Sequence, residues 1–237
     1  MFNSPFDQFE LTVLTKFLPL TNYTVYLMIS VTCALFILSI SIQRNLLIPT
    51  PFQLFYEGLY VFILSLVTEQ VGKSKTGLKY FPVLFTLFQF ILVSNLLGLL
   101  PYSFTITSHI ALTLLLSLSF FSAWIIEGFR NLGLKFLRIF LPSNIPMWLL
   151  PLLVVIEILS FLIRPLSLSI RLFANMLAGH ILLFILGTAT LGLGLAGLLP
   201  FVFICAFLIL ELGIAFLQAY VFTILLCIYL ADSTKAH

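Results

Sequence analysis

The chain has 237 residues, of which 62% are hydrophobic and 8% are charged. It exposes too little polar surface to dissolve, which excludes a soluble globular protein and indicates an integral membrane protein surrounded mostly by lipid. The formal net charge of +3 comes from lysines and arginines in loops rather than from one basic face, and this argues against nucleic acid as a partner.

The first third of the chain predicts one membrane crossing followed by a helix on the membrane surface. A bilayer core takes about 20 apolar residues of helix, and residues 24–42 fit one crossing. The residues before it resemble neither a secretory signal nor a transit peptide. Residues 49–72 are also apolar but carry Glu57 and Glu69. They therefore predict an amphipathic helix that lies in the interface.

Two further crossings are predicted at residues 81–100 and 110–126, both uncharged. Basic residues gather in the loops after the first and the third crossing, and the turn at 101–108 has none. All the basic loops therefore share one face, which the positive-inside bias places in the cytoplasm or the organellar matrix. The N-terminus is expected on the opposite side.

The C-terminal part predicts a hairpin of two long helices, residues 147–191 and 199–230. The first is about twice as long as a perpendicular crossing needs, and tilt accommodates excess length. The sequence thus predicts an all-α, polytopic protein with a single membrane domain (1–237) that ends in a strongly tilted hairpin. Residues with turn-forming tendency are expected to close the hairpin: Gly187, Gly192, Gly194, Gly197 and Pro200.

The first hairpin helix carries three charged residues at intervals of seven, namely Glu157, Arg164 and Arg171. Seven steps of about 100° nearly close two turns, so the three share one face, with the small Ser167 between them. A buried arginine keeps its proton, and at a helix centre it costs at least roughly 2.5 to 3.5 kcal/mol. Arg171 is therefore the leading functional candidate. Arg164 has two simpler alternatives, an ion pair with Glu157 or a side chain that reaches to the membrane interface.

Four other polar residues lie in the hairpin, and either function or helix packing explains them. His180 is nine residues from Arg171, which turns it to the opposite side of the helix, toward the hairpin partner or a water-filled cavity. On the second helix Glu211 and Gln218 are seven apart and form a polar stripe, so the hairpin can bring Glu211 near His180. Asn175 completes the set.

Metal and disulfide chemistry are not suggested by the cysteines, which stand singly in apolar stretches at positions 33, 205 and 227. His109 follows a polar turn and is interpreted as an interfacial residue. No cofactor and no metal are expected.

Three segments carry a resemblance to a known family. Residues 167–180 read Ser-Leu-Ser-Ile-Arg-Leu-Phe-Ala-Asn-Met-Leu-Ala-Gly-His, residues 95–101 read Asn-Leu-Leu-Gly-Leu-Leu-Pro, and residues 211–218 read Glu-Leu-Gly-Ile-Ala-Phe-Leu-Gln. Together with the order of crossings, they resemble subunit a of the F-type ATP synthases, in its mitochondrial form. Two departures from many bacterial relatives are Gly98, where those often have an acid, and the apparent exchange of histidine and acid between positions 180 and 211.

The resemblance implies a proton-translocating stator subunit without catalytic activity of its own. It implies a rotor ring of proteolipid c subunits, peripheral-stalk subunits and other membrane-sector subunits as partners. It also implies the mitochondrial inner membrane, with the N-terminus on the intermembrane-space side and the C-terminus on the matrix side. Arg171 matches the essential arginine that faces the ring carboxylates between two aqueous half-channels. The other proton-pathway positions are Glu211, His180, Glu157, Asn175 and Gln218, with Asn95, Ser167 and Arg164 as helix-packing or channel-lining residues.

Two other classes remain as alternatives. A self-contained secondary transporter would have repeated halves and broken helices aimed at a central substrate, and neither a repeat nor a duplicated polar motif is visible. A structural subunit of a redox complex would leave Arg171 as a packing bridge, and haem binding would ask for histidine pairs on crossings.

Overall fold

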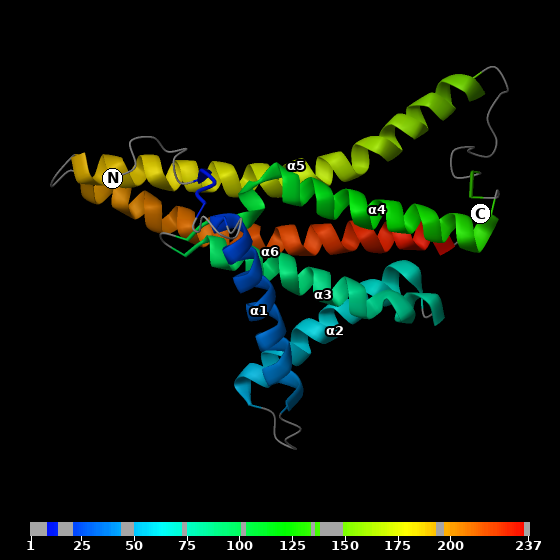
Figure 1. The fold of residues 1–237 in the computed structure, drawn as a ribbon, viewed down its shortest axis with the longest axis horizontal. Coiled ribbons are helices and arrows are strands. Elements are labelled where there is room, and N and C mark those ends of the chain that lie inside the picture. Colours follow the sequence, from blue (N-terminus) through cyan, green and yellow to red (C-terminus); the bar gives the residue numbers. More distant parts are fainter. Residues whose placement is uncertain are drawn as a thin grey trace. The chain divides into compact units, whose positions relative to one another are not determined.

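The computed structural model describes residues 9–13, 21–43, 50–72, 75–100, 103–133, 136–137, 149–192 and 197–234. Apart from one isolated bridge between Val13 and Thr21, these residues form helices and the segments that join them, as Figure 1 shows. The predicted all-helical class is therefore confirmed. The elements are α1 (Asn22–Gln43), α2 (Pro51–Val71), α3 (Lys75–Gly98), the short 3₁₀ helix η2 (Ile106–Ser108), α4 (Ile110–Leu132), α5 (Leu150–Gly192) and α6 (Leu198–Thr234).

Six helices of the described part are long and apolar enough to cross a membrane, which agrees with a polytopic membrane protein. They include α2, which qualifies by length and composition although the sequence favours an interfacial position. The position of α2, the arrangement of the crossings, the tilt of the hairpin and the single membrane domain therefore stay predictions.

Local signals explain where α2 begins and ends. The Thr50 side chain accepts a hydrogen bond from the Gln53 backbone N–H, and Pro51 occupies the first helical position, where its missing N–H leaves no hydrogen bond unmade. At the other end Gly72 has a φ of 83°, a conformation that glycine adopts without strain.

The predicted hairpin turn is placed partly wrongly. The helix α5 continues through Gly187 and ends only at Gly192, and Pro200 is already the third residue of α6. A lone glycine costs a helix only about 1 kcal/mol relative to alanine, which a long apolar helix outweighs. Proline is tolerated in a first helical turn because no backbone hydrogen bond is lost there.

The end of the hairpin nearest the turn is closely packed. Gly194 lies outside the described residues, but Gly197 directly precedes α6 and contacts the backbone of Thr190 in α5. A methyl group at Gly197 would lie 3.2 Å from the carbonyl carbon of Thr190 and closer still to its oxygen. Glycine therefore permits the close approach here.

The chain divides into two compact units. The first unit comprises Met1–Leu47, Phe88–Leu112 and Arg171–Tyr220. Inside it, Gln89 of α3 donates a hydrogen bond to the Ala34 carbonyl of α1 over 2.8 Å. The Phe88 ring meets the Phe216 ring of α6 edge to face at 6.0 Å. Parts of α1, α3 and α6 therefore form one packed body.

The second unit comprises Ile48–Leu87, Thr113–Ile170 and Val221–His237. Aromatic rings hold it together. The Tyr60 ring of α2 packs against the rings of Phe81 and Phe85 in α3, at 4.9 and 5.6 Å. The Phe121 ring of α4 packs against Phe161 of α5 and Tyr229 of α6, at 4.7 and 5.9 Å.

Candidate functional site

The polar side chains singled out from the sequence fall into two groups, one in each compact unit. The first unit holds Asn95, Arg171, Asn175, His180, Glu211 and Gln218. The second unit holds Glu157, Arg164 and Ser167. The predicted common face of Glu157, Arg164 and Arg171 includes residues of both units and stays a prediction.

Arg171 lies on the surface of α5. Its side chain is exposed, and it forms no hydrogen bond or ion pair with any residue that the structure describes. The side chains of Ala178 and Leu182, farther along the same helix, are also exposed. A cation embedded in a membrane usually pairs with an acid or with water. No described residue of this chain supplies such an acid to Arg171.

Glu211 lies at the contact between the two hairpin helices. Its side chain is 6% exposed, and its carboxylate packs directly against Gly179 of α5. A methyl group at Gly179 would lie 2.8 Å from the carboxyl carbon of Glu211, so a glycine is required for this approach. The Oε2 atom of Glu211 is buried and has no partner among the described residues.

His180 follows Gly179 and therefore stands next to the Glu211 contact. Its ring is within hydrogen-bonding reach of the Gly98 backbone at the end of α3, and the ring of Phe9 lies edge-on at 6.4 Å. The Nε2 atom of His180 is buried without a partner in the described part of the chain. No hydrogen bond joins the side chains of Glu211 and His180, and each keeps one buried polar atom without a partner among the described residues.

Asn95 connects α3 to the same part of α6. Its side chain is fully buried, and its Nδ2 donates to the Ala215 carbonyl over 3.4 Å, one helical turn beyond Glu211. Its Oδ1 has no partner among the residues described. Buried polar atoms are almost always hydrogen-bonded to protein or to water. Asn95, His180 and Glu211 thus bring three unsatisfied polar atoms to adjoining turns of three helices.

The remaining members of the first group have different surroundings. Gln218 is 4% exposed, and Glu211, Ala215 and Gln218 form a buried stripe on α6. The predicted polar stripe on this helix is therefore present. Asn175 is half-buried on α5.

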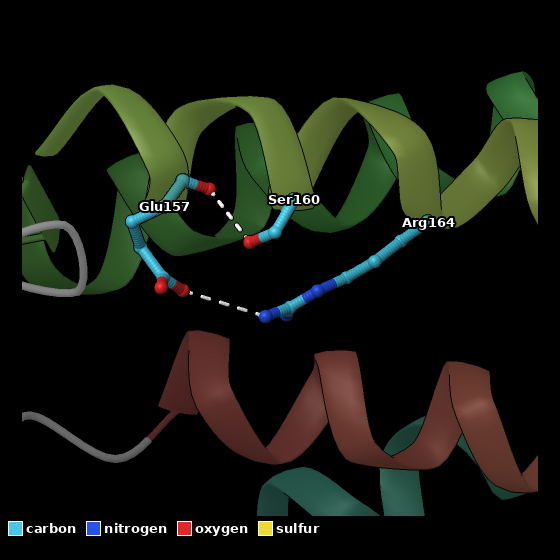
Figure 2. A network of polar contacts seen from close by, with 3 residues as sticks. All are labelled: Glu157, Ser160 and Arg164. Carbon is cyan, nitrogen blue, oxygen red and sulfur yellow. Dashed lines mark hydrogen bonds and ion pairs between the residues drawn. The ribbon is translucent and has the colours of Figure 1, made fainter. Parts of the chain in front are cut away.

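The second group is an ion pair on α5. The Nη2 atom of Arg164 donates to Oε1 of Glu157 over 3.4 Å, and each side chain is about one-third exposed (34% and 32%). Figure 2 shows the two side chains extended toward each other, while Ser160 donates to the Glu157 carbonyl. The Arg164 guanidinium also lies over the Phe161 and Tyr229 rings, at 5.9 and 5.8 Å. The simpler interpretation of Arg164, an internal pair, is therefore what the structure contains.

Two contacts were not anticipated from the sequence. Ser167 is exposed, whereas the buried Ser169 donates to the Thr113 hydroxyl of α4 over 3.1 Å. The second contact is that of Gly179 with the Glu211 carboxylate, and the sequence alone assigns no role to this glycine. One sequence feature could have indicated this contact. Gly179 directly precedes His180 in a helix that is predicted to face the helix carrying Glu211.

The sequence of the chain is similar to those of known proteins. The sequence model of the family described as "ATP synthase A chain" matches residues 23–231. The chain is 44% identical to ATP synthase subunit a of Dictyostelium citrinum, with 99% of each chain covered. It is 41% identical to ATP synthase subunit a of a Wolbachia strain from Brugia malayi, with 98% and 99% covered, and 43% identical to that of Marchantia polymorpha, with 99% of each covered.

Proposed function

The chain belongs to the ATP synthase A chain family and is thereby a proton-translocating subunit of the membrane sector, and from this premise we propose how its residues move protons. It acts as a stator beside a rotor ring of proteolipid c subunits. Two aqueous half-channels within it lead protons to and from the ring carboxylates. The subunit is non-catalytic, and other subunits make ATP.

Arg171 is the residue that faces the ring. A ring carboxylate must be protonated while it crosses lipid, because an isolated buried carboxylate is prohibitively expensive. Beside the Arg171 guanidinium the same carboxylate ionises, because an opposite charge within about 4 to 6 Å favours its charged form. The fixed positive charge also repels a proton that would pass directly between the half-channels. Protons must then travel around with the ring.

Proton uptake uses the polar cluster of the first unit. Glu211 and His180 load the ring carboxylate from the side opposite the basic loops. Support comes from the burial of Glu211 against Gly179 and from the buried, unpartnered Oε2 of Glu211 and Nε2 of His180, since a group already paired on all sides is a poor relay. Asn95 holds α6 at this point through the Ala215 carbonyl. Asn175 and Gln218 line the path between this cluster and the ring.

Proton release uses Glu157 on the side of the basic loops. Support comes from its partial exposure beside Arg164, which leaves the carboxylate accessible to water. Arg164 and Ser167 shape this part of α5. Each elementary charge that crosses about 100 mV carries about 2.3 kcal/mol, so several protons per turn can drive remote ATP formation.

The setting follows from the same proposal. The protein is a multi-pass subunit of the mitochondrial inner membrane, with the N-terminus in the intermembrane space and the C-terminus in the matrix. Peripheral-stalk subunits and other membrane-sector subunits of the synthase hold it against the ring. The positive-inside distribution of loop lysines and arginines supports this orientation. The relatives include a bacterial one, so the compartment rests on the resemblance to the mitochondrial form.

One observation carries the proposal: Arg171 is exposed on an apolar helix and forms no ion pair within the described part of its own chain. The test replaces Arg171 by alanine in the assembled complex. We expect coupled ATP synthesis to be lost and passive proton leak to rise, because the electrostatic barrier between the half-channels disappears. Measurements are ATP synthesis driven by an imposed proton gradient, and proton flux without nucleotide.

Arg130→Ala is the matched control, since it also removes one exposed cation, at the end of α4. It should leave coupling intact. Normal coupling in Arg171→Ala complexes would refute the proposed function, and so would equal defects in both variants.

A further inference from the structure

The turn between α3 and α4 buries polar side chains that helix packing alone does not require. Thr105 donates to the Ser108 hydroxyl over 2.8 Å, and Ser108 donates back to the Thr105 carbonyl over 2.7 Å. Thr107 is 1% exposed, and its hydroxyl has no partner among the described residues. Nε2 of His109, the next residue but one, is likewise buried and unpartnered within the described ranges. Groups of this kind bind water or exchange protons.

The His109 ring is held by aromatic neighbours of the first unit. The Phe104 ring stacks on it at 5.1 Å with an interplanar angle of 25°, and the Tyr23 ring of α1 meets it edge-on at 5.6 Å. This setting fixes the position and the plane of the ring. Burial lowers the pKa of His109, so the imidazole is neutral near pH 7. A neutral imidazole has one nitrogen that donates and one that accepts, which is what a proton relay needs.

The turn is connected to the Glu211 cluster at the end of α3. Ser103 donates to the Gly98 carbonyl over 3.0 Å, and the Thr105 side chain packs against the Gly98 Cα so closely that a Cβ there would lie 3.5 Å from Cβ of Thr105. The His180 ring approaches the backbone of the same Gly98. The polar turn and His180 therefore meet at one glycine, inside one compact unit.

We propose that His109, assisted by the Thr107 hydroxyl, is the uptake relay that passes protons from the face of the α3–α4 turn to His180 and Glu211. The inference rests on the proposed function, because it adds a first station to the same half-channel. A hydronium ion at the face gives a proton to one imidazole nitrogen and becomes water, while the other nitrogen releases its proton inward. One N–H bond forms as another breaks, and the ring recovers its starting tautomer by a half-turn about its Cβ–Cγ bond.

A purely structural role for His109 makes different predictions. In that case the ring only docks α1 on the turn, through the contacts with Tyr23 and Phe104. Phenylalanine at position 109 would then preserve function, whereas loss of the Phe104 ring would impair it. The two roles are separated by variants that keep the ring but remove the nitrogens, or keep the nitrogens but weaken the packing.

The experiment uses vesicles that contain the whole ATP synthase and measures ATP-driven proton pumping and passive proton flux per assembled complex. We expect His109→Phe to lower both about tenfold, below the usual range of about 10² to 10⁴ for a general acid–base group, because water partly bypasses the ring. His109→Gln should show a similar loss of flux. It provides the same test if the His109→Phe complex fails to assemble. Free imidazole in the medium should restore flux to His109→Ala.

The control is Phe104→Leu, which should reduce the temperature at which the complex dissociates while flux per complex stays normal. Normal flux in whichever of His109→Phe and His109→Gln assembles would overturn the inference, as would His109→Ala flux that imidazole leaves unchanged. Glu211→Gln is measured in parallel. If it blocks flux while the His109 variants conduct normally, only the relay fails; if it also conducts normally, the proposed uptake path itself fails.

Discussion

The two groups of polar side chains, one in each compact unit, differ in how completely their hydrogen-bonding capacity is satisfied. In the second unit, Arg164 has an ion-pair partner in Glu157 and two aromatic rings beneath its guanidinium. In the first unit, Asn95, His180 and Glu211 each leave a buried polar atom without a partner among the described residues. Partnered groups stabilise a local arrangement, whereas unpartnered ones retain the capacity to bind water and protons. Of the two groups, the one in the first unit therefore keeps more capacity to bind water and protons.

The largest effect should come from Glu211→Gln. Glutamine keeps the size of the side chain but cannot accept and release a proton, so we expect proton flux to fall about 10²-fold or more, which is the usual contribution of a positioned acid–base group. The measurement is passive and ATP-driven proton flux in membranes that contain the assembled complex. Flux close to that of the unmodified protein would break the comparison, because the unsatisfied carboxylate would then be without function.

A second variant tests the same carboxylate without changing it. Gly179→Ala places a methyl group against the Glu211 carboxylate, so the side chain must move and flux should fall, though less than in Glu211→Gln. Gly187→Ala is the matched control, since it is in the same helix and nothing lies within 4 Å of its added methyl group. The control should stabilise α5 by up to about 1 kcal/mol and leave flux unchanged. Equal flux in the two alanine variants would show that the approach of Glu211 to Gly179 is unimportant.

Asn95 should give the next smaller effect. Asn95→Leu removes the amide that holds the Ala215 carbonyl, at a cost of about 1 kcal/mol in stability, and lets α6 shift near Glu211. We expect both a lower dissociation temperature of the complex and a reduced flux per complex. Gln89→Leu is the control, because Gln89 is the other amide of α3 with a bond to a neighbouring helix, through the Ala34 carbonyl. It should lower stability only. A flux defect of the same size in both variants would assign Asn95 to packing.

Periodicity and polarity were enough to predict most of the fold. Residues 110–126 and 199–230 fall inside α4 and α6, because a long run of apolar residues can satisfy its backbone in lipid only as a helix. The turn was harder. Gly187 and Pro200 were assigned to it because their local conformational preferences favour turns, but the surrounding apolar helices outweigh those preferences.

The sequence proposes the residues of the site, and those roles stay predictions, but it does not predict their contacts. Seven-residue spacing placed Glu211 and Gln218 on one stripe of α6, and both are buried. Spacing within one helix carries no information about which residue of another helix lies opposite, so the contact of Glu211 with Gly179 and that of Asn95 with Ala215 came only from tertiary packing. The aromatic setting of Arg164 was missed for the same reason, because Tyr229 is 65 residues farther along the chain.

The smallest effect is expected for the Glu157–Arg164 pair, whose side chains already have partners. Measuring it tests the comparison in the second unit. Glu157→Gln, Arg164→Gln and the double variant form a cycle that measures the interaction between the two side chains. Both are about one-third exposed, so their coupling should be about 1 kcal/mol or less in the dissociation free energy of the complex.

Glu157→Gln should also slow proton release a few-fold, less than the change at Glu211, because water on the exposed side can substitute for one carboxylate. A coupling of several kcal/mol would mean that a neighbouring subunit encloses the pair, since only a desolvated ion pair reaches that strength. In that case the environment of the Glu157–Arg164 pair would also depend on another subunit, and the two groups could not be compared from this chain alone.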